Sequence, residues 1–150
     1  MTDKNEIGQF YQTTNILGEN YNPMEMVRFS EVPTFMRAPL VKDLSHVDIG
    51  MIGIPYDGGL TCRTGARYGL REVRNQSTMM RTINVATGVQ PFELARIGDI
   101  GDVQFGNMFS QDRVVANIEQ YYDAITQAGV TPLGIGGDHS VTYPILKALA

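Results

Sequence analysis

Largely apolar runs occur at two places along residues 45–150. The runs at residues 47–55 and 130–135 are typical of strands that are buried on both faces of a parallel sheet. A third strand, combined with a turn, is predicted within residues 94–103. Pro55 ends the first run, because proline cannot donate a hydrogen bond to a sheet ladder. These runs predict a mostly parallel sheet.

Apolar residues at helical spacing separate the runs. One helix is predicted over residues 70–81, with an inward face of Leu70, Val73, Ser77 and Met80. A second helix follows Ser110, has Asp112 in its first turn and stops at Gly129, and its predicted stripe is Val114, Ile118, Tyr121, Ile125 and Ala128. A third helix begins at Val141. Strands that alternate with helices predict an α/β fold with helices on the faces of the sheet.

Residues 1–44 lack a sustained apolar period. They contain Pro23, Pro33 and Pro39, with aromatic residues scattered between them. This segment is too aromatic for a plain disordered tail, so we interpret it as an irregular N-terminal arm that packs on the body or on a neighbouring subunit. The alternative is a loosely held terminal segment.

Composition excludes several classes of protein. The 150 residues suffice for one domain, and a net charge of −4 lacks the basic balance of a nucleic-acid-binding protein. No apolar stretch approaches the ~18 residues that span a bilayer, and the N-terminus lacks a signal-peptide pattern. The single cysteine, Cys62, excludes an internal disulfide and fits a reducing compartment. We expect a cytoplasmic protein that binds neither nucleic acid nor membrane.

The last strand runs into Gly136-Gly137-Asp138-His139-Ser140. A histidine at the point where a parallel strand opens into a helix is well placed for a metal ligand or a catalytic group. Neutral imidazole binds Mn, Zn, Ni or Fe, and a flanking acid can fix its tautomer. The alternative is that Asp138 and Ser140 only cap the following helix and that His139 only packs. His139 also replaces the third glycine of a dinucleotide-binding fingerprint, and neither a P-loop nor a nucleophile elbow occurs.

These five residues resemble the first metal-binding motif of the ureohydrolases, the arginase and agmatinase family. Residues 52–59 resemble the first strand and loop of the family, and residues 99–103 resemble its Asp-x-Gly-Asp-Val segment. Residues 65–74 resemble its glycine–arginine segment, with Leu70 where proline is commoner. The resemblance covers residues 47–150, and residues 35–39 extend it into the arm. It is greatest for the agmatinase-like branch, in which the stretches at 79–84, 91–94 and 133–149 look most like guanidinobutyrases and guanidinopropionases.

The resemblance implies a three-layer α/β/α sandwich, here incomplete, with residues 45–150 as the N-terminal half of the domain. Family members hydrolyse a guanidinium group to urea and an amine with two metal ions, usually Mn²⁺, with nickel as an alternative. Two cations lower the pKa of a bridging water, which supplies the strong nucleophile that guanidinium requires. His139 corresponds to the first metal ligand, and Asp138 and Ser140 would support it or cap the helix. The family also forms trimers or hexamers, so we expect a homo-oligomer in which the arm is part of a subunit contact.

Most of the implied metal site lies outside this chain. The later ligands of the family come from Asp-x-His-x-Asp and Asp-x-Asp motifs, and neither occurs here. We therefore expect no catalytic residue in the chain, no hydrolase activity from it alone, an open strand edge and an exposed apolar helix face. The candidate substrates are 4-guanidinobutyrate and 3-guanidinopropionate, which we favour, and agmatine or free guanidine with nickel. A different class of function, a catalytically inactive binding or regulatory subunit, applies if the protein ends at Ala150.

The long loop between residues 56 and 68 contains Arg63 and Arg67. Long loops in compact domains are usually functional, and this one follows the C-terminal end of a strand and should border the cleft. Either arginine is a candidate partner for the carboxylate of a guanidino acid. The alternative, which we favour, is that both bind carboxylates within the fold or across a subunit contact. We assign no role to Cys62 or His46.

Overall fold

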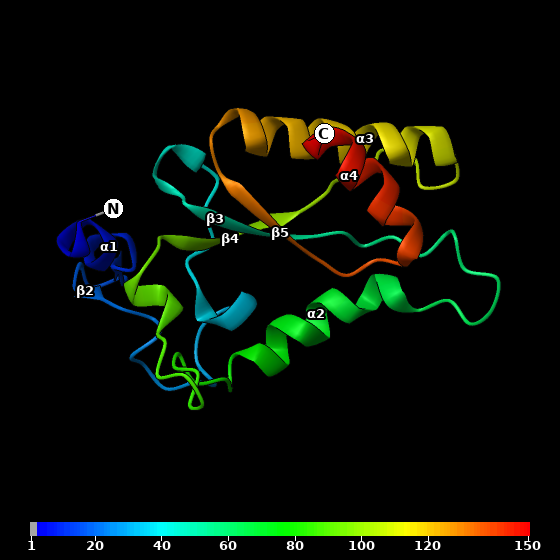
Figure 1. Cartoon of the computed structure of the whole chain (residues 1–150). Coiled ribbons are helices and arrows are strands. Elements are labelled where there is room, and N and C mark those ends of the chain that lie inside the picture. Colours follow the sequence, from blue (N-terminus) through cyan, green and yellow to red (C-terminus); the bar gives the residue numbers. More distant parts are fainter. Residues whose placement is uncertain (1–2) are drawn as a thin grey trace.

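The computed structural model describes residues 3–150, which are built around a three-stranded sheet (Figure 1). The central strand is β3 (Ile49–Gly53), and its neighbours are β4 (Ile97–Asp102) and β5 (Thr131–Ile135). Both neighbours run parallel to β3. The structure thus confirms the predicted parallel sheet.

Helices connect these strands and cover both faces of the sheet. Helix α2 (Ala66–Ser77) links β3 to β4, and α3 (Gln111–Gln127) links β4 to β5. After β5 the chain continues into α4 (Thr142–Leu149). Figure 1 shows α2 on one side of the sheet and α3 with α4 on the other. The three-layer α/β/α class is therefore confirmed.

Strand β3 shows how the sequence produces these layers. Its side chains alternate between the faces, as the pleat of a strand requires. Met51 joins a buried cluster with Leu70 of α2, whereas Ile52 joins a cluster with Ile118 of α3. A strand with a core on each side must be apolar at successive positions, which is why residues 47–55 form a largely apolar run.

Helix α2 spans residues 66–77, not the predicted 70–81. The predicted inward face was also partly wrong: Leu70 and Ser77 are buried, but Val73 and Met80 are 43% and 52% exposed. Arg74 takes an inward position because its Nε donates to Oδ2 of buried Asp99 at 2.8 Å. A charged residue on the inner face disturbs the apolar period on which the sequence prediction relied.

Helix α3 matches the prediction except at one tyrosine, at one cap and at Ala128, which was predicted to face inward but is exposed at the C-cap. Its fully buried residues are Val114, Ile118, Tyr122 and Ile125. Tyr122 rather than the predicted Tyr121 lies in the core, because the spacing of four, four and three residues keeps these side chains on one face. Ser110 occupies the N-cap position but its side chain makes no capping hydrogen bond. Asp112 lies in the first turn, and Gly129 follows the helix with φ +76°.

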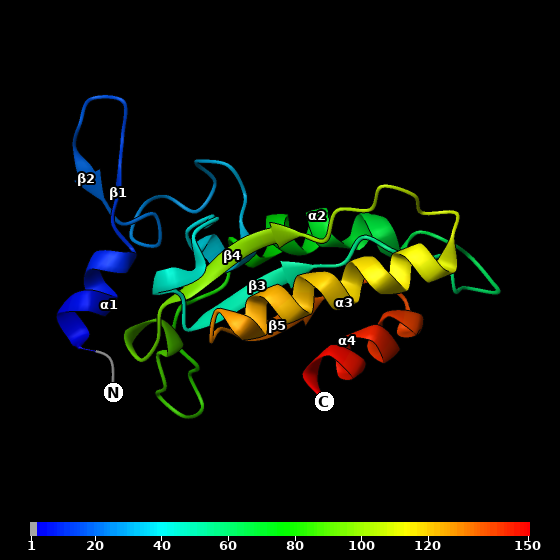
Figure 2. The ribbon, with the colours of Figure 1, turned by 90° about the horizontal axis from the view of Figure 1, so that it is seen from above.

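The N-terminal segment contains regular structure that the sequence pattern did not reveal. It begins with α1 (Lys4–Phe10), and β1 (Thr13–Thr14) then pairs antiparallel with β2 (Asn20–Tyr21). Figure 2 shows this hairpin projecting away from the sheet. The Tyr11 hydroxyl donates to the Ala95 carbonyl oxygen at 2.6 Å and accepts from the Ile97 amide at 2.8 Å. The segment is thus joined to the body at the start of β4.

A buried ion pair makes a second connection between the arm and the sheet. Asp99 of β4 is fully buried, and its carboxylate accepts from the amides of Phe35 and Gly101 as well as from Arg74. The Arg74 guanidinium carbon lies 3.9 Å from the centroid of the Phe35 ring. Phe35 begins the 3₁₀ helix η1 (Phe35–Arg37), so this network holds η1 against α2.

The two edges of the sheet differ. Residues 39–41 run along the outer edge of β4, where the Val41 amide donates to the Asp99 carbonyl oxygen at 2.8 Å. Within residues 3–150, β5 pairs only with β3. Apolar side chains are exposed beside this open edge and on α4, and they are Leu133, Tyr143, Leu146 and Leu149. The predicted open strand edge and exposed apolar helix face are both present.

Two further short helices connect these elements: η2 (Leu44–His46) precedes β3, and η3 (Pro91–Glu93) precedes β4.

Across residues 3–150, we find no helix with the length and apolar character needed to cross a lipid bilayer.

Candidate functional site

The C-terminal ends of the parallel strands meet at one edge of the sheet, which is where α/β proteins commonly bind ligands. After β3 the chain enters a loop, and after β5 it turns into the 3₁₀ helix η4 (His139–Val141). The Asp138 amide donates to the Tyr56 carbonyl oxygen at 2.9 Å, so the two segments are in direct contact. In Figure 1 both lie at the end of the sheet farthest from the N-terminus.

Two glycines allow the turn that presents His139. Gly136 and Gly137 have φ values of +88° and +80°, in the region that favours glycine. A Cβ at Gly136 would lie 2.1 Å from Leu70 Cδ2, and a Cβ at Gly137 would lie 3.1 Å from the Ile54 carbonyl oxygen. The backbone is thereby packed tightly against β3 and α2. His139 follows as an exposed side chain, with Nδ1 3.3 Å from Thr142 Oγ1.

The carboxylate of Asp138 is buried beside this exposed histidine. Its Oδ1 accepts from the Ser140 amide at 2.8 Å and from the Ser140 hydroxyl, and so caps η4. Its Oδ2 accepts from the Gly59 amide at 2.7 Å. Both oxygens therefore have partners within the chain, and Asp138 joins the loop after β3 to the turn after β5.

A second buried carboxylate, Asp57, organises the other end of the same loop. Its Oδ2 accepts from the Gly65 amide at 2.7 Å and from the Arg67 amide at 3.3 Å. These amides lie at the N-terminus of α2, so Asp57 supplies the cap that Gly65 has no side chain to provide. This cap explains why α2 begins before the predicted residue 70.

Arg67 is occupied by the same carboxylate. Its Nε donates to Asp57 Oδ1 at 2.5 Å, and its terminal nitrogen forms an ion pair with the same oxygen. The hydrogen bond from Arg67 holds the pKa of Asp57 below its usual range, and the pairing raises the pKa of Arg67. Arg67 thus binds a carboxylate within the fold, which is the alternative that the sequence analysis favoured over a substrate contact.

Arg63 differs from Arg67 because it lies in the exposed middle of the loop. Its φ is +51°, and it makes no ion pair with any residue in the range 3–150. Cys62, its neighbour, is also exposed. Arg63 therefore remains a candidate for binding a ligand at this edge.

The described residues do not by themselves form a metal site. Among residues 3–150 no three His, Cys, Asp or Glu side chains lie close enough together to hold a metal ion. His139 has the right chemistry and exposure for one ligand, whereas the neighbouring Asp138 carboxylate is occupied by hydrogen bonds. The described residues therefore fit a metal site in which His139 supplies one ligand and residues outside this set supply the others.

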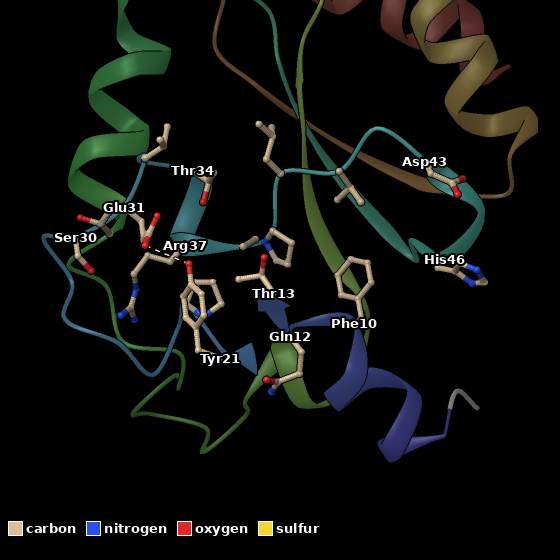
Figure 3. Close-up of a pocket in the computed structure, with 17 residues that line it drawn as sticks. Phe10, Gln12, Thr13, Tyr21, Ser30, Glu31, Thr34, Arg37, Asp43 and His46 are labelled. Atoms are coloured by element: carbon tan, nitrogen blue, oxygen red, sulfur yellow. Dashed lines mark hydrogen bonds between the residues drawn. The ribbon is translucent and has the colours of Figure 1, made fainter. Parts of the chain in front are cut away.

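A cavity of about 580 Å³ lies elsewhere and is lined mostly by residues of the arm (Figure 3). Its lining includes Phe10, Tyr21, Arg37 and His46, and none of the residues predicted for the site. The candidate site thus depends on the strand ends rather than on this cavity.

Sequence reasoning missed Asp57 and the partners of Asp138. A signal for Asp57 was present, because it directly follows a buried strand and precedes two glycines. Its partners lie across a long loop, and spacing alone does not identify them.

Comparison with known proteins places these features in a family. The arginase family matches residues 47–150. The chain is 45% identical over 125 residues to a guanidinopropionase from Pseudomonas aeruginosa, a match that covers 83% of this chain and 39% of the relative. It is 44% identical over 128 residues to a guanidinobutyrase from the same organism, covering 83% and 40%.

Solved structures agree with these sequence matches. The proclavaminate amidino hydrolase of Streptomyces clavuligerus superposes with a TM-score of 0.77 at 32% identity, covering 83% of this chain and 41% of that chain. A formiminoglutamase variant from Trypanosoma cruzi, solved with Mn²⁺, gives 0.61 at 25% identity, covering 70% and 35%. The chain spans 39–40% of the length of the two Pseudomonas relatives.

Proposed function

The chain belongs to the arginase family, and we propose that the protein containing it hydrolyses a small guanidino compound to urea and an amine. The observation that carries this proposal is the exposed His139 at the C-terminal edge of the sheet, in a chain 45% identical to a guanidinopropionase. By the whole protein we mean residues 1–150 together with a C-terminal part like that of the relatives. Residues 45–150 would form the N-terminal half of its α/β domain.

We propose that two Mn²⁺ ions bind at this edge, with nickel as the alternative. His139 would supply one ligand, and the others would come from the C-terminal part. When bound, such a pair of ions lowers the pKa of a shared water, so that hydroxide is available near neutral pH. Asp138 and Ser140 would contribute by fixing the turn that presents His139.

The substrates we favour are 4-guanidinobutyrate and 3-guanidinopropionate, in line with the names of two relatives. Both carry a carboxylate, which an arginine can bind through paired hydrogen bonds. Because Asp57 already occupies Arg67, Arg63 is the better candidate for this contact. Agmatine, which has no carboxylate, would not use Arg63.

We also propose a homo-oligomeric cytoplasmic protein, either a trimer or a hexamer. The projecting hairpin supports a subunit contact through the arm, because Ile16 and Leu17 at its tip are exposed. The single cysteine supports a reducing compartment.

Sequencing the gene beyond codon 150 is the first test. A frame that continues into Asp-x-His-x-Asp and Asp-x-Asp supports the hydrolase. A stop codon directly after Ala150 would instead support the binding or regulatory subunit.

Urea release is the direct test of the activity. We expect the whole protein, supplied with Mn²⁺ or Ni²⁺, to release urea from at least one guanidino acid, and residues 1–150 alone to release none. An absence of urea from guanidino acids, agmatine and guanidine with either metal would refute the proposed hydrolase.

Arg63→Ala separates the substrate classes. We expect it to raise KM for guanidino acids by about tenfold or more, as the loss of a charged hydrogen bond requires, and to leave KM for agmatine unchanged. An unchanged KM for the guanidino acids would exclude this role for Arg63.

A further inference from the structure

The loop of residues 57–65 is fastened at both ends by buried carboxylates. Asp57 holds the C-terminal end of the loop, at the start of α2, by accepting hydrogen bonds from the amides of Gly65 and Arg67. Asp138 binds its beginning, through the amide of Gly59. Residues 58–65 are all exposed, so these hydrogen bonds rather than burial hold the loop in place.

The contact between Gly59 and Asp138 has little free space around it. A Cβ at Gly59 would lie 2.8 Å from Ser140 Oγ and 3.0 Å from Asp138 Oδ2. The Asp138 amide also donates to the Tyr56 carbonyl oxygen, so backbone and side chain of one residue hold the same strand-to-loop junction. His139 follows Asp138 directly, so the histidine and this junction are adjacent in the same turn.

We propose that Asp138 is a positioning residue that locks the loop of residues 57–65 against the turn bearing His139, so that the loop forms a fixed wall of the substrate site. Both Asp138 oxygens are used in this lock, so Asp138 is not itself a metal ligand. That the loop is a wall of a substrate site rests on the proposed function. That Asp138 holds the loop in place does not.

The chain offers a matched control for the side chain. Asp43-Leu44-Ser45 repeats the local motif of Asp138-His139-Ser140, and Asp43 Oδ1 accepts from the Ser45 amide at 3.0 Å to cap η2. Asp43 has no counterpart of the bond to Gly59 among residues 3–150. Asp138→Asn and Asp43→Asn therefore both alter a cap, but only the first alters the lock.

A second variant disturbs the same Gly59–Asp138 contact by a change in the loop. Gly59→Ala places a methyl group against Ser140 and Asp138 without changing either residue. Its control is Gly106→Ala, because a Cβ at Gly106 would meet nothing within 4 Å. If Asp138→Asn fails to fold by circular dichroism, Gly59→Ala decides the question.

The loop contains its own probe, because Cys62 is exposed and is the only cysteine of the chain. A nitroxide attached to Cys62 reports the mobility of the loop by electron paramagnetic resonance. We expect greater mobility in Asp138→Asn and Gly59→Ala, and spectra like the parent protein in the two controls. Tryptic cleavage after Arg63 should also accelerate by about tenfold, since loss of a charged hydrogen bond increases the open population.

In the whole protein, Asp138→Asn should raise KM more than it lowers kcat and leave the bound metal content unchanged. Loss of bound metal in Asp138→Asn but not in Gly59→Ala, which keeps the carboxylate, would identify Asp138 as a ligand and overturn the proposal. Unchanged label mobility and cleavage in the lock variants, or equal changes in the controls, would also overturn it. If the parent protein releases no urea but the lock variants still mobilise the loop, the proposed function fails and the lock stands.

Discussion

Replacing Asp99 with asparagine tests how the arm is joined to the sheet. Asp99 is fully buried, and each of its oxygens accepts two hydrogen bonds. Oδ2 accepts from the Phe35 amide at 3.0 Å and from Arg74 Nε at 2.8 Å. Oδ1 accepts from the Gly101 amide at 2.9 Å and from Arg74 Nη2 at 3.0 Å.

The geometry sets the size of the effect. In asparagine one oxygen becomes an NH₂ group, so either orientation of the amide points a donor at two other donors. Two buried N–H groups then lack partners, and Arg74 loses one of its two acidic partners while it keeps the ion pair with Asp102. Removing one member of a buried ion pair costs about 3–5 kcal/mol, which is a large part of the stability of an ordinary domain.

The assay is urea unfolding of residues 1–150, followed by circular dichroism. We expect Asp99→Asn to lower the free energy of unfolding by about 3–5 kcal/mol and the melting temperature by about 10 °C. The control is Glu119→Gln, which makes the same acid-to-amide change in the exposed pair with Lys147 and should have little effect. A loss below about 1 kcal/mol for Asp99→Asn would refute the argument that this network stabilises the fold.

Three further predictions concern buried tyrosines and acid stability. Tyr11→Phe loses the bonds to Ala95 and Ile97 and should destabilise the chain by about 1–3 kcal/mol, whereas Tyr122→Phe should be neutral or slightly stabilising, because the Tyr122 hydroxyl has no partner among residues 3–150. Urea unfolding compares them, and equal losses would contradict this. Burial raises the pKa of both Tyr11 and Tyr122 to about 12, so in an alkaline absorbance titration at least two of the seven tyrosines should ionise well above the usual pH of about 10. Ionisation of all seven near pH 10 in the folded chain would contradict it. Hydrogen bonds from Arg96 lower the pKa of Asp48, so the stability that this pair contributes is fully present above about pH 4 and is lost as pH falls through the lower folded-state pKa. The stability gap between the parent chain and Asp48→Asn should therefore shrink in acid, and a gap that stays constant with pH would rule this out.

Within residues 45–150, the local pattern was enough to predict the order of the main strands and helices. Each strand with a core on both sides needs a continuous apolar run, and each helix against the sheet needs an apolar stripe, so both signals are present in short windows. The pattern failed at α2 because Arg74 occupies an inward position, and it chose Tyr121 over Tyr122 because adjacent tyrosines look alike in sequence.

Motifs identified the candidate site only in part. The glycine pair and His139 could be located from the sequence, because the turn from a strand into a helix requires particular residues at adjacent positions. Capping by Asp138 was among the sequence alternatives and is present, but its bond to Gly59 could not be predicted. The role of Asp57 and the partner of Arg67 also depend on residues that only the fold brings together. Arg63 and Arg67 illustrate this, because they occur in the same loop but only Arg67 meets a buried carboxylate.

The sequence by itself determined the alternation of strands and helices, the membership of the arginase family and the position of His139. The tertiary structure decided where α2 begins, which arginine remains exposed, which edge of the sheet is covered and what Asp138 binds. The physical reason is distance along the chain: apolar periodicity acts between neighbours, whereas the Gly59–Asp138 bond joins residues 79 apart and the Arg74–Asp99 pair joins residues 25 apart. Such bonds form only after the strands have assembled and brought their partners together.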